Sequence, residues 1–247
     1  ATGATYAPST GLTEDTWYRR KVTATVNGQT CTETTNEVVI TVINFTPGTV
    51  QSDQTICEGE TPAELTTDVA PAGDGSFTYL WQESSNGFTF TNAAGINNTE
   101  NYDPPALTQD MWYKRLVTAD VGGATCTEET PVIKVTVINF TPGSISSDQT
   151  ICSGDTPNPL TSITPSGDGA FTYLWEESTD NSNWVNAAGT NDEETYTPAA
   201  LTQDMYYRRQ VTAEVGGQTC TEVTNVVTIT VNNVTPGVIA GEETICE

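Results

Sequence analysis

The chain has 247 residues, a length that suits two or three domains, and its 8 basic and 32 acidic residues give a formal charge of −24. This balance excludes a nucleic-acid-binding protein, because no basic patch exists to neutralise phosphates, and it disfavours anionic membrane surfaces. The chain contains no His, the commonest general base and metal ligand. No apolar run approaches the roughly 20 residues of a membrane helix, so we expect no membrane insertion by this segment.

A sequence repeat organises the chain. Asn-Phe-Thr-Pro-Gly at 44–48 returns at 139–143 and, with Val for Phe, at 233–237, a spacing of 95 and then 94 residues. Self-similarity at a fixed period indicates a repeat architecture. The predicted domains are the C-terminal half of a repeat (1–47), two complete repeats (48–142 and 143–236) and the first strand of another repeat (237–247). We expect the chain to be a section of a longer array.

One repeat shows a series of short strands with turn signals between them. For the repeat at 143–236 the predicted elements, in chain order, are a first strand at 143–151, an irregular segment with two prolines at 156–163, strands at 171–176 and from 184, a short segment at 195–196, a long strand at 207–215 and a last strand at 223–231. Gly-Asp-Gly and Gly-Gly pairs mark the turns. About seven such strands are typical of an immunoglobulin-like sandwich. The predicted fold is all-β: tandem immunoglobulin-like β-sandwich repeats of about 95 residues that form an elongated rod.

Aromatic residues are expected in the core of each repeat. Trp81 and Trp175 occupy the place of the core Trp on the third strand of such a sandwich. Tyr113 and Tyr207 each open a long strand and follow a Leu by six residues, the arrangement of a tyrosine corner. These four residues are the predicted aromatic core.

Strand alternation places an arginine on the same inner face, Arg115 in one repeat and Arg209 in the next. A buried Arg needs a partner. One hypothesis is that Arg115 stacks on Trp81, and Arg209 on Trp175, as cation–π pairs of about 1 kcal/mol each. The alternative is that both side chains extend to nearby carboxylates.

An even number of cysteines suggests disulfides in a secreted protein. The six are Cys31, Cys57, Cys126, Cys152, Cys220 and Cys246. One scheme pairs them within repeats, as Cys57–Cys126 and Cys152–Cys220, and leaves Cys31 and Cys246 to partners outside the chain. The other pairs all six at a separation of 26 residues. The first scheme is favoured, because first and last strands can be neighbours in such a sandwich and bridged Cα atoms lie within about 7 Å.

Two local features bear on the joints between repeats and on metal binding. The Thr-Pro-Gly junctions predict a semi-rigid connection, with Phe45 and Phe140 packing there. Asp74 and Asp168, with Asp53 and Asp148, recur between repeats and are the candidates for a calcium site. The alternative for the Gly-Asp-Gly pair is turn formation, so the main expectation is no metal and no cofactor.

The motifs at these positions resemble a known family. Asp-Gln-Thr-Ile-Cys, then Tyr-Leu-Trp-x-Glu-Ser, then Ala-Leu-Thr-Gln-Asp-x-x-Tyr-x-Arg, are similar to the Ig-like repeats of giant surface proteins of Bacteroidota, and most of all to those of flavobacterial gliding-motility adhesins. The resemblance covers the whole chain. It implies export by the type IX secretion system, an extracellular location at the cell surface, display as long filaments, and no catalytic residues.

Three functions follow for testing. The leading one is a non-catalytic stalk or filament segment of a large secreted adhesin, whose partners are the neighbouring repeats and a surface polysaccharide or substratum. The second is a glycan- or protein-binding module that uses outer-face aromatics such as Trp112 and Tyr206. The third is an accessory region of a secreted enzyme.

Overall fold

The computed structural model describes residues 3–8, 11–146 and 148–246, and every regular element in them is a β-strand. Position 147, inside the first strand predicted at 143–151, lies outside the described residues. The chain divides into two compact units: Ala1–Ser52, Ala63–Pro105 and Met111–Lys134 form unit 1, and Asp53–Pro62, Ala106–Asp110 and Val135–Glu247 form unit 2. No helix in the described ranges is long and apolar enough to cross a membrane.

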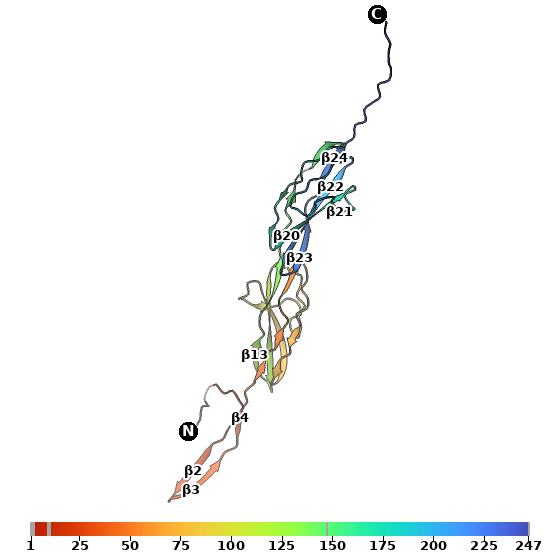
Figure 1. Ribbon diagram of the computed structural model, residues 1–247. Coiled ribbons are helices and arrows are strands. Elements are labelled where there is room, and N and C mark those ends of the chain that lie inside the picture. Colours follow the sequence, from red (N-terminus) through yellow and green to blue (C-terminus); the bar gives the residue numbers. More distant parts are fainter. Residues whose placement is uncertain (1–2, 9–10, 147, 247) are drawn as a thin grey trace. The chain divides into compact units, whose positions relative to one another are not determined.

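The main sheet of unit 2 has six strands. Its order is β17-β24-β22-β20-β21, with β23 paired to β22 beside this path. The strands are β17 (Gln149–Cys152), β20 (Ala170–Ser178), β21 (Val185–Asn186), β22 (Met205–Val215), β23 (Gln218–Val223) and β24 (Val227–Asn232). β17, which forms the end of the first strand predicted at 143–151, pairs in parallel with the last strand β24, while β22 is antiparallel to β20, β23 and β24. β20, β22 and β24 can be followed in Figure 1.

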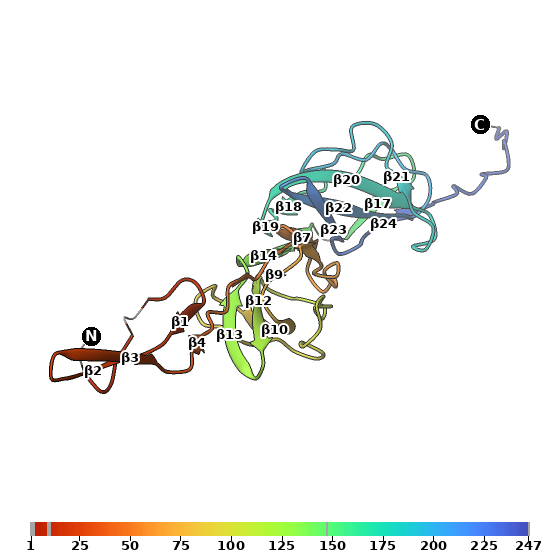
Figure 2. The same ribbon diagram turned by 90° about the horizontal axis from the view of Figure 1, so that it is seen from below.

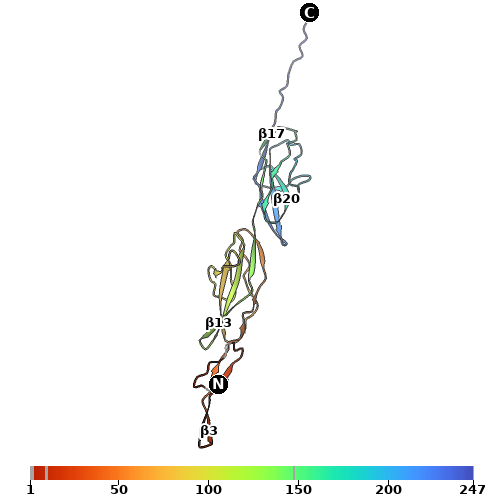
Figure 3. The same cartoon turned by 90° about the vertical axis from the view of Figure 1, so that its left-hand side faces the viewer.

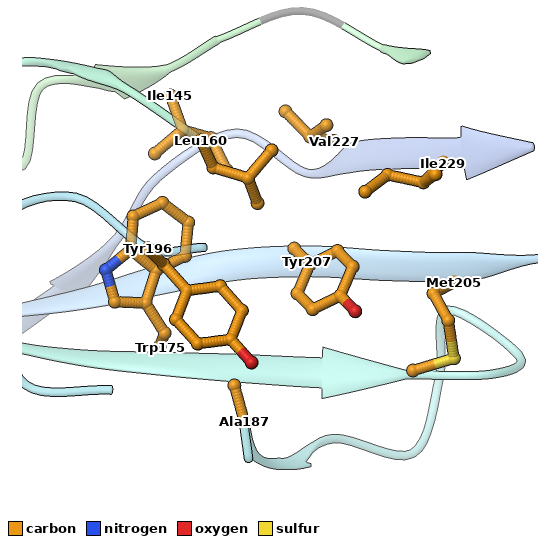
Figure 4. Packing of buried hydrophobic residues seen from close by; sticks show 9 residues of the cluster. All are labelled: Ile145, Leu160, Trp175, Ala187, Tyr196, Met205, Tyr207, Val227 and Ile229. Atoms are coloured by element: carbon orange, nitrogen blue, oxygen red, sulfur yellow. The ribbon is translucent and has the colours of Figure 1, made fainter. Parts of the chain in front are cut away.

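Short strand pairs form the opposing layer. β16 (Ser144–Ile145) pairs with β18 (Ser162–Ile163), and β15 (Phe140–Thr141) pairs with β19 (Ser166–Gly167). Along β22 the inner positions are buried at every second residue, as the two-residue period of a strand requires. Figure 4 shows the resulting core between the layers, which contains Ile145, Leu160, Trp175, Ala187, Tyr196, Met205, Tyr207, Val227 and Ile229. The repeat is therefore an immunoglobulin-like β-sandwich.

Unit 1 repeats this design. Here β10 (Ser76–Ser84) pairs with β11 (Thr91–Asn92) and β12 (Met111–Val121), and β12 pairs with β13 (Ala124–Glu129). The short pairs are β5 (Phe45–Thr46) with β9 (Ala72–Gly73) and β6 (Thr49–Val50) with β8 (Thr67–Val69). β10, β12 and β13 are labelled in Figure 2. Tyr102 bridges to Leu65 as Tyr196 does to Leu160, so the two repeats share their register.

The first strand of the repeat at 48–142 belongs to unit 2. β7 (Gln54–Cys57) runs parallel to β14 (Ile133–Ile138), with Gln54 opposite Val135 and Cys57 opposite Ile138. This register is the one seen between β17 and β24, where Cys152 lies opposite Asn232. In both repeats the first strand therefore ends in a cysteine beside the end of the last strand.

Before β5, the described residues of the leading segment form four strands. β1 (Thr16–Tyr18) pairs with β4 (Val38–Ile40), and β2 (Lys21–Val26) pairs with β3 (Gln29–Thr34). Every residue of β2 and β3 is exposed, whereas alternate residues of β12 and β22 are buried. At the other end, residues 233–246 form no strand (Figure 3).

The predicted last strand at 223–231 is wrong at its start, because Val223 ends β23 and β24 begins at Val227. β23 and β24 are separated at Thr224, whose N–H donates to Arg209 O and whose Oγ1 accepts from Arg209 N, both at 3.0 Å. Asn225 then turns its side chain to Ile145, accepting from its N–H at 2.8 Å and donating to its carbonyl at 3.3 Å. β23 thereby pairs only with β22, as the second arm of a hairpin.

Candidate functional site

One disulfide joins consecutive repeats. Cys57 and Cys220 are bonded, with their Cα atoms 5.6 Å apart and a sequence separation of 163. Cys57 ends the first strand of the repeat at 48–142, and Cys220 lies on β23, the hairpin arm of the next repeat. Both residues belong to unit 2. We call this disulfide and the residues packed around it the joint.

The predicted pairs Cys57–Cys126 and Cys152–Cys220 are wrong, and the scheme with 26-residue separations is wrong for Cys57 and Cys220 as well. First and last strands are indeed neighbours, but they are parallel, so Cys152 lies at the end of β24. Cys220 lies on β23, beyond the start of β24, and is therefore remote from Cys152. The other cysteines among the described residues are free and exposed: Cys31, Cys126, Cys152 and Cys246.

An apolar cluster surrounds the disulfide. Ile138, Ala213 and Cys220 are buried, and partly buried side chains complete the cluster: Cys57, Phe140, Phe171 and Val215. The rings of Phe140 and Phe171 are 5.7 Å apart, which confirms the prediction that Phe140 packs at the junction. The cluster combines the end of one repeat with the sheet of the next, so the joint is a small core shared by two repeats.

Backbone pairing fixes the same joint. Asn139 N–H donates to Asp168 Oδ2 at 3.0 Å, and Asp168 N–H donates to Asn139 O at 2.8 Å. Phe140 lies opposite Gly167 in the β15–β19 pair. Gly167 has φ 122°, and a Cβ there would collide with the carbonyl of Asn139 and lie 2.6 Å from Phe140 Cα. Asp168, a calcium candidate, therefore uses one carboxylate oxygen to hold the chain between repeats.

The junction at residue 45 has the same construction within unit 1. Asn44 N–H donates to Asp74 Oδ2 and Asp74 N–H donates to Asn44 O, both at 2.9 Å. The rings of Phe45 and Phe77 are 5.8 Å apart, so Phe45 also packs as predicted. The hairpin cysteine here is Cys126, opposite Ala119 just as Cys220 is opposite Ala213, but it is unbonded and exposed.

A cavity of about 330 Å³ lies beside the disulfide. It is lined by Cys57, Glu58, Glu60, Ile138, Phe140 and residues 219–222. Three glutamates reach this lining, and Glu60 uses one carboxylate oxygen to accept from Cys57 N–H at 3.0 Å. The cavity gives solvent and small thiols a path to the disulfide.

Each core contains its predicted arginine, fully buried. Arg115 Cζ lies 5.7 Å from the ring centre of Trp81, and Arg209 Cζ lies 5.8 Å from that of Trp175. A nearer ring escaped the sequence analysis: Tyr79 is 4.8 Å from Arg115, and its counterpart Tyr173 is 4.7 Å from Arg209. Strand alternation could have predicted this tyrosine, because a residue two positions before each Trp lies on the same face of the strand.

The hydrogen bonds that these two arginine side chains make go to carbonyl and hydroxyl oxygens and not to carboxylates. Arg115 Nη1 donates to Thr67 Oγ1 and to Glu100 O, both at 2.6 Å. Burial lowers the pKa of Arg115, while Tyr79 and Glu100 act to raise it. Nε and Nη2 of Arg115 have no hydrogen-bond partner. The rings of Tyr79 and Trp81 provide further contacts to this guanidinium group.

The tyrosines of the predicted tyrosine corner are buried in the core, Tyr113 in one repeat and Tyr207 in the next. Tyr113 is fully buried, and burial raises its pKa, yet its hydroxyl has no partner. The hydroxyl that donates to the backbone belongs to Tyr102, which bonds Ala94 O at 2.9 Å. Tyr196 does the same with Ala188 O at 2.8 Å in the next repeat.

The outer-face aromatics predicted for ligand binding are partly exposed, and neighbouring residues lie beside the ring of Trp112. Lys134 Nζ lies 5.1 Å from the ring centre of Trp112, and a Cβ built on Gly87 would approach that ring to 3.3 Å. Both Trp112 and Tyr206 are half-buried.

Comparisons with known proteins found solved structures that are similar to most of the chain and one matching protein family. No curated protein matches the chain. Among solved structures, domains A168-A170 of titin are similar over 87% of this chain and 75% of that chain, with 18% identity and a TM-score of 0.39. Fibronectin(III)-like modules of Clostridium thermocellum CbhA are similar over 82% of this chain and 100% of that chain, with 12% identity and a TM-score of 0.32.

A family model matches twice, at residues 46–139 and at residues 141–233. Each match covers one copy of the repeat unit described above, and together the two matches account for most of the chain. The chain belongs to the family described as "Domain of unknown function (DUF8696)".

Proposed function

We propose that this chain is a structural segment of a large, secreted cell-surface adhesin, in which repeats are cross-linked so that they resist mechanical tension. The single observation that supports this role is the disulfide between Cys57 and Cys220. It joins the first strand of one repeat to the last hairpin of the next, so the link adds to the peptide connection at the junction.

The consequence for tension follows from the covalent path. Force applied at the two ends of the chain passes from Cys57 to Cys220 through the sulfur atoms. Residues 58–219 lie inside the closed loop, so tension cannot extend them while the disulfide is intact. A stalk that must keep its length under shear needs this property.

The location fits the same role. Disulfides persist in oxidising surroundings and are rare in the cytosol, and a formal charge of −24 keeps a crowded surface protein soluble and self-repelling. The resemblance to repeats of Bacteroidota gliding adhesins supports display at the cell surface. Attachment to a polysaccharide or a substratum stays a prediction.

Force spectroscopy on single molecules tests the proposal. The chain is held by both ends and stretched, first in oxidising buffer and then with a reductant. Reduction is expected to add roughly 540–580 Å of extension, since residues 58–219 become free at about 3.3–3.6 Å per residue. The Cys57→Ser/Cys220→Ser variant should show this full length without reductant. An unchanged length on reduction, or low unfolding forces in the oxidised chain, would contradict the role.

A further inference from the structure

The hairpin tip between β10 and β11 contains an Asn-Gly pair, Asn86-Gly87. Asn86 is exposed, so water reaches its side-chain amide. Gly87 has φ 74° and no Cβ, so no side chain of its own keeps its backbone nitrogen away from the amide carbon of Asn86. These two groups are therefore candidates for a reaction of the chain with itself.

Three hydrogen bonds converge on Oδ1 of Asn86. The N–H groups of Phe88 and Thr89 donate to this oxygen at 2.8 and 2.9 Å, and Ser84 Oγ donates to it at 2.9 Å. Donors that are already aimed at a carbonyl oxygen stabilise the negative charge that develops there when a nucleophile attacks the carbonyl carbon. The hairpin tip thus surrounds the Asn86 amide in the way that an oxyanion hole surrounds an acyl group.

Ser84 connects the same oxygen to the neighbouring backbone nitrogen. Its Oγ accepts from Gly87 N–H at 3.0 Å and donates to Asn86 Oδ1. Ser84 is 3% exposed, so its hydroxyl is kept in this position. One hydroxyl therefore joins the nitrogen that can attack to the oxygen that has to receive its proton, which is the arrangement of a general acid–base relay.

We propose that Asn86 is a modification site, at which the folded chain converts this asparagine to aspartate without an enzyme. Gly87 N bonds to Asn86 Cγ while its proton passes to Ser84 Oγ, and the Ser84 hydroxyl proton passes to Oδ1. The adduct returns the Oδ1 proton to Nδ2, which leaves as ammonia, and a succinimide ring remains. One water molecule then opens the ring. The balance is one water consumed and one ammonia released, with no oxidant or reductant.

The next repeat has the product of this reaction at the equivalent position. Asp180 Oδ1 accepts from Asn183 N–H at 2.7 Å and from Ser182 N–H at 2.9 Å, and Ser178 Oγ donates to it at 2.9 Å. Hydrogen bonds from Asn183, Ser182 and Ser178 hold the pKa of Asp180 well below its usual range. An aspartate at position 86 would find the same three donors, and hydrogen bonds to a charged acceptor are the stronger ones.

The two hairpin tips also share their backbone conformation. Gly87 and Asn181 occupy equivalent positions and both lie in the left-handed region, with φ 74° and 57°. Ser84 and Ser178 are equally buried. The tip of the repeat at 48–142 is therefore already built to hold a carboxylate, so the reaction replaces a weaker acceptor by a stronger one.

The same donors decide which way the succinimide opens. Attack of water on Cγ places the developing charge on Oδ1, opposite the N–H groups of Phe88 and Thr89, and gives aspartate. Attack on the main-chain carbonyl carbon of Asn86 gives isoaspartate, which adds one atom to the backbone of a tip whose path is fixed by these hydrogen bonds. We expect aspartate to be the main product.

Mass spectrometry of the 247-residue chain tests the proposal. The folded chain is incubated at neutral pH, and the amide and carboxylate forms of peptides containing position 86 are quantified over time, with aspartate and isoaspartate separated. Asn86 should convert several-fold faster in the folded chain than in a synthetic peptide of residues 82–92, with aspartate in excess. A rate in the folded chain equal to or below that of the peptide, or isoaspartate as the main product, would overturn the proposal.

Variants at Ser84 separate the relay from simple exposure of the Asn-Gly pair. Ser84→Ala should slow the conversion several-fold, whereas Ser84→Thr keeps a hydroxyl and should restore most of the rate. Asn27-Gly28, the same dipeptide between β2 and β3, is the internal reference, and neither variant should change its rate. Faster conversion of Asn86 in Ser84→Ala would show that the hydrogen bonds protect this amide, and the proposal would fall.

The stability of the product gives a second readout. Asn86→Asp places the carboxylate directly and should raise the unfolding temperature at physiological salt, where repulsion among surface carboxylates is screened. Asp180→Asn, the reverse change in the next repeat, should lower it. A lower unfolding temperature for Asn86→Asp would contradict the proposal. None of these variants alters Cys57 or Cys220, so failure of this proposal leaves the tension-resisting role standing.

Discussion

The buried guanidinium of Arg209 donates from Nη2 to the carbonyl oxygen of Pro142 at 3.1 Å. Pro142 belongs to the Thr-Pro-Gly junction at the start of the repeat, and Arg209 is in the middle of its largest strand. Nη1 of the same arginine donates to Glu194 O at 2.6 Å. The core of the repeat is thereby tied to the junction, and the geometry of the joint depends on an intact core.

Replacing Arg209 tests this connection between the core of the repeat and the junction. Arg209→Met removes two hydrogen bonds and leaves the carbonyls of Pro142 and Glu194 without their donor, which costs about 1–3 kcal/mol for each buried acceptor. We expect the free energy of unfolding of the repeat to fall by about 2–5 kcal/mol, measured by denaturant titration of the oxidised chain. Arg115→Met is the matched control, because Arg115 donates to Thr67 and Glu100 from Nη1, while its Nη2, the atom that in Arg209 bonds the junction proline, has no hydrogen-bond partner. Only Arg209→Met should also raise amide exchange at residues 140–143.

Breaking the disulfide tests the stability of the joint. In the chain-entropy model, a loop of more than 100 residues stabilises the folded state by about 4–5 kcal/mol relative to the reduced chain. Cys57→Ser/Cys220→Ser should therefore lower the unfolding temperature by several degrees, as should a reductant with the unchanged chain. The Cys31→Ser variant serves as the control, since Cys31 is exposed and unbonded. Equal stability of the reduced and oxidised chains would argue against a structural joint.

Alkaline pH tests the tyrosine cluster of each core. Burial, followed by the charge of Glu83, raises the pKa of Tyr102 from 10.0 to about 12. A raised pKa in the folded state means that stability is constant below pH 10 and is lost as the pH rises from 10 towards 12. Unfolding followed by tryptophan fluorescence in the Cys57→Ser/Cys220→Ser background, where alkaline disulfide cleavage cannot contribute, should show this loss. Tyr102→Phe should reduce its steepness, while a substitution at the exposed Tyr6 should leave it unchanged.

The sequence was sufficient for the core and insufficient for the disulfide. Alternation along one long strand is local, so it correctly placed Tyr113 and Arg115 on a buried face. A disulfide depends on the direction of pairing between strands far apart in the chain. Parallel and antiparallel pairing of first and last strands have the same sequence pattern, and only the parallel arrangement sends Cys57 towards the next repeat.

The start of β24 escaped prediction although the sequence carries a sign of it. From Val227 to Val231 apolar and polar residues alternate, but Asn225 falls on the apolar face and Val226 on the polar face, so the period of two is interrupted across residues 224–226. Two hydrogen bonds between Thr224 and the backbone of Arg209, a residue on another strand, lie at this interruption. The mismatch at Asn225 and Val226 is therefore the local signal that separates β23 from β24.

The close approach at Gly167 gives a sharp mutational test of the joint. Gly167→Ala introduces a Cβ that collides with Asn139 O and lies 2.6 Å from Phe140 Cα, in addition to the strain of φ 122°. We expect a loss of about 2–4 kcal/mol and slower formation of the Cys57–Cys220 disulfide during oxidative refolding. Gly154→Ala is the control. Gly154 has φ 93° and open space where a Cβ would lie, so this substitution should cost only the backbone strain, about 1 kcal/mol. An equal loss of stability in the two variants would mean that β15 does not pair with β19 in solution.

Asp168 decides between a structural and a metal-binding role at the joint. One of its carboxylate oxygens accepts the backbone N–H of Asn139 at 3.0 Å, so Asp168→Ala should lower the stability of the repeat by about 1–2 kcal/mol. Asp168→Asn keeps an acceptor oxygen and should cost less than half of that. Under the structural role, millimolar Ca²⁺ leaves the unfolding temperature of all three chains unchanged. A rise with Ca²⁺ in the unsubstituted chain, absent from both variants, would instead assign Asp168 as a calcium ligand, because a cation bound only by the folded state stabilises it by mass action.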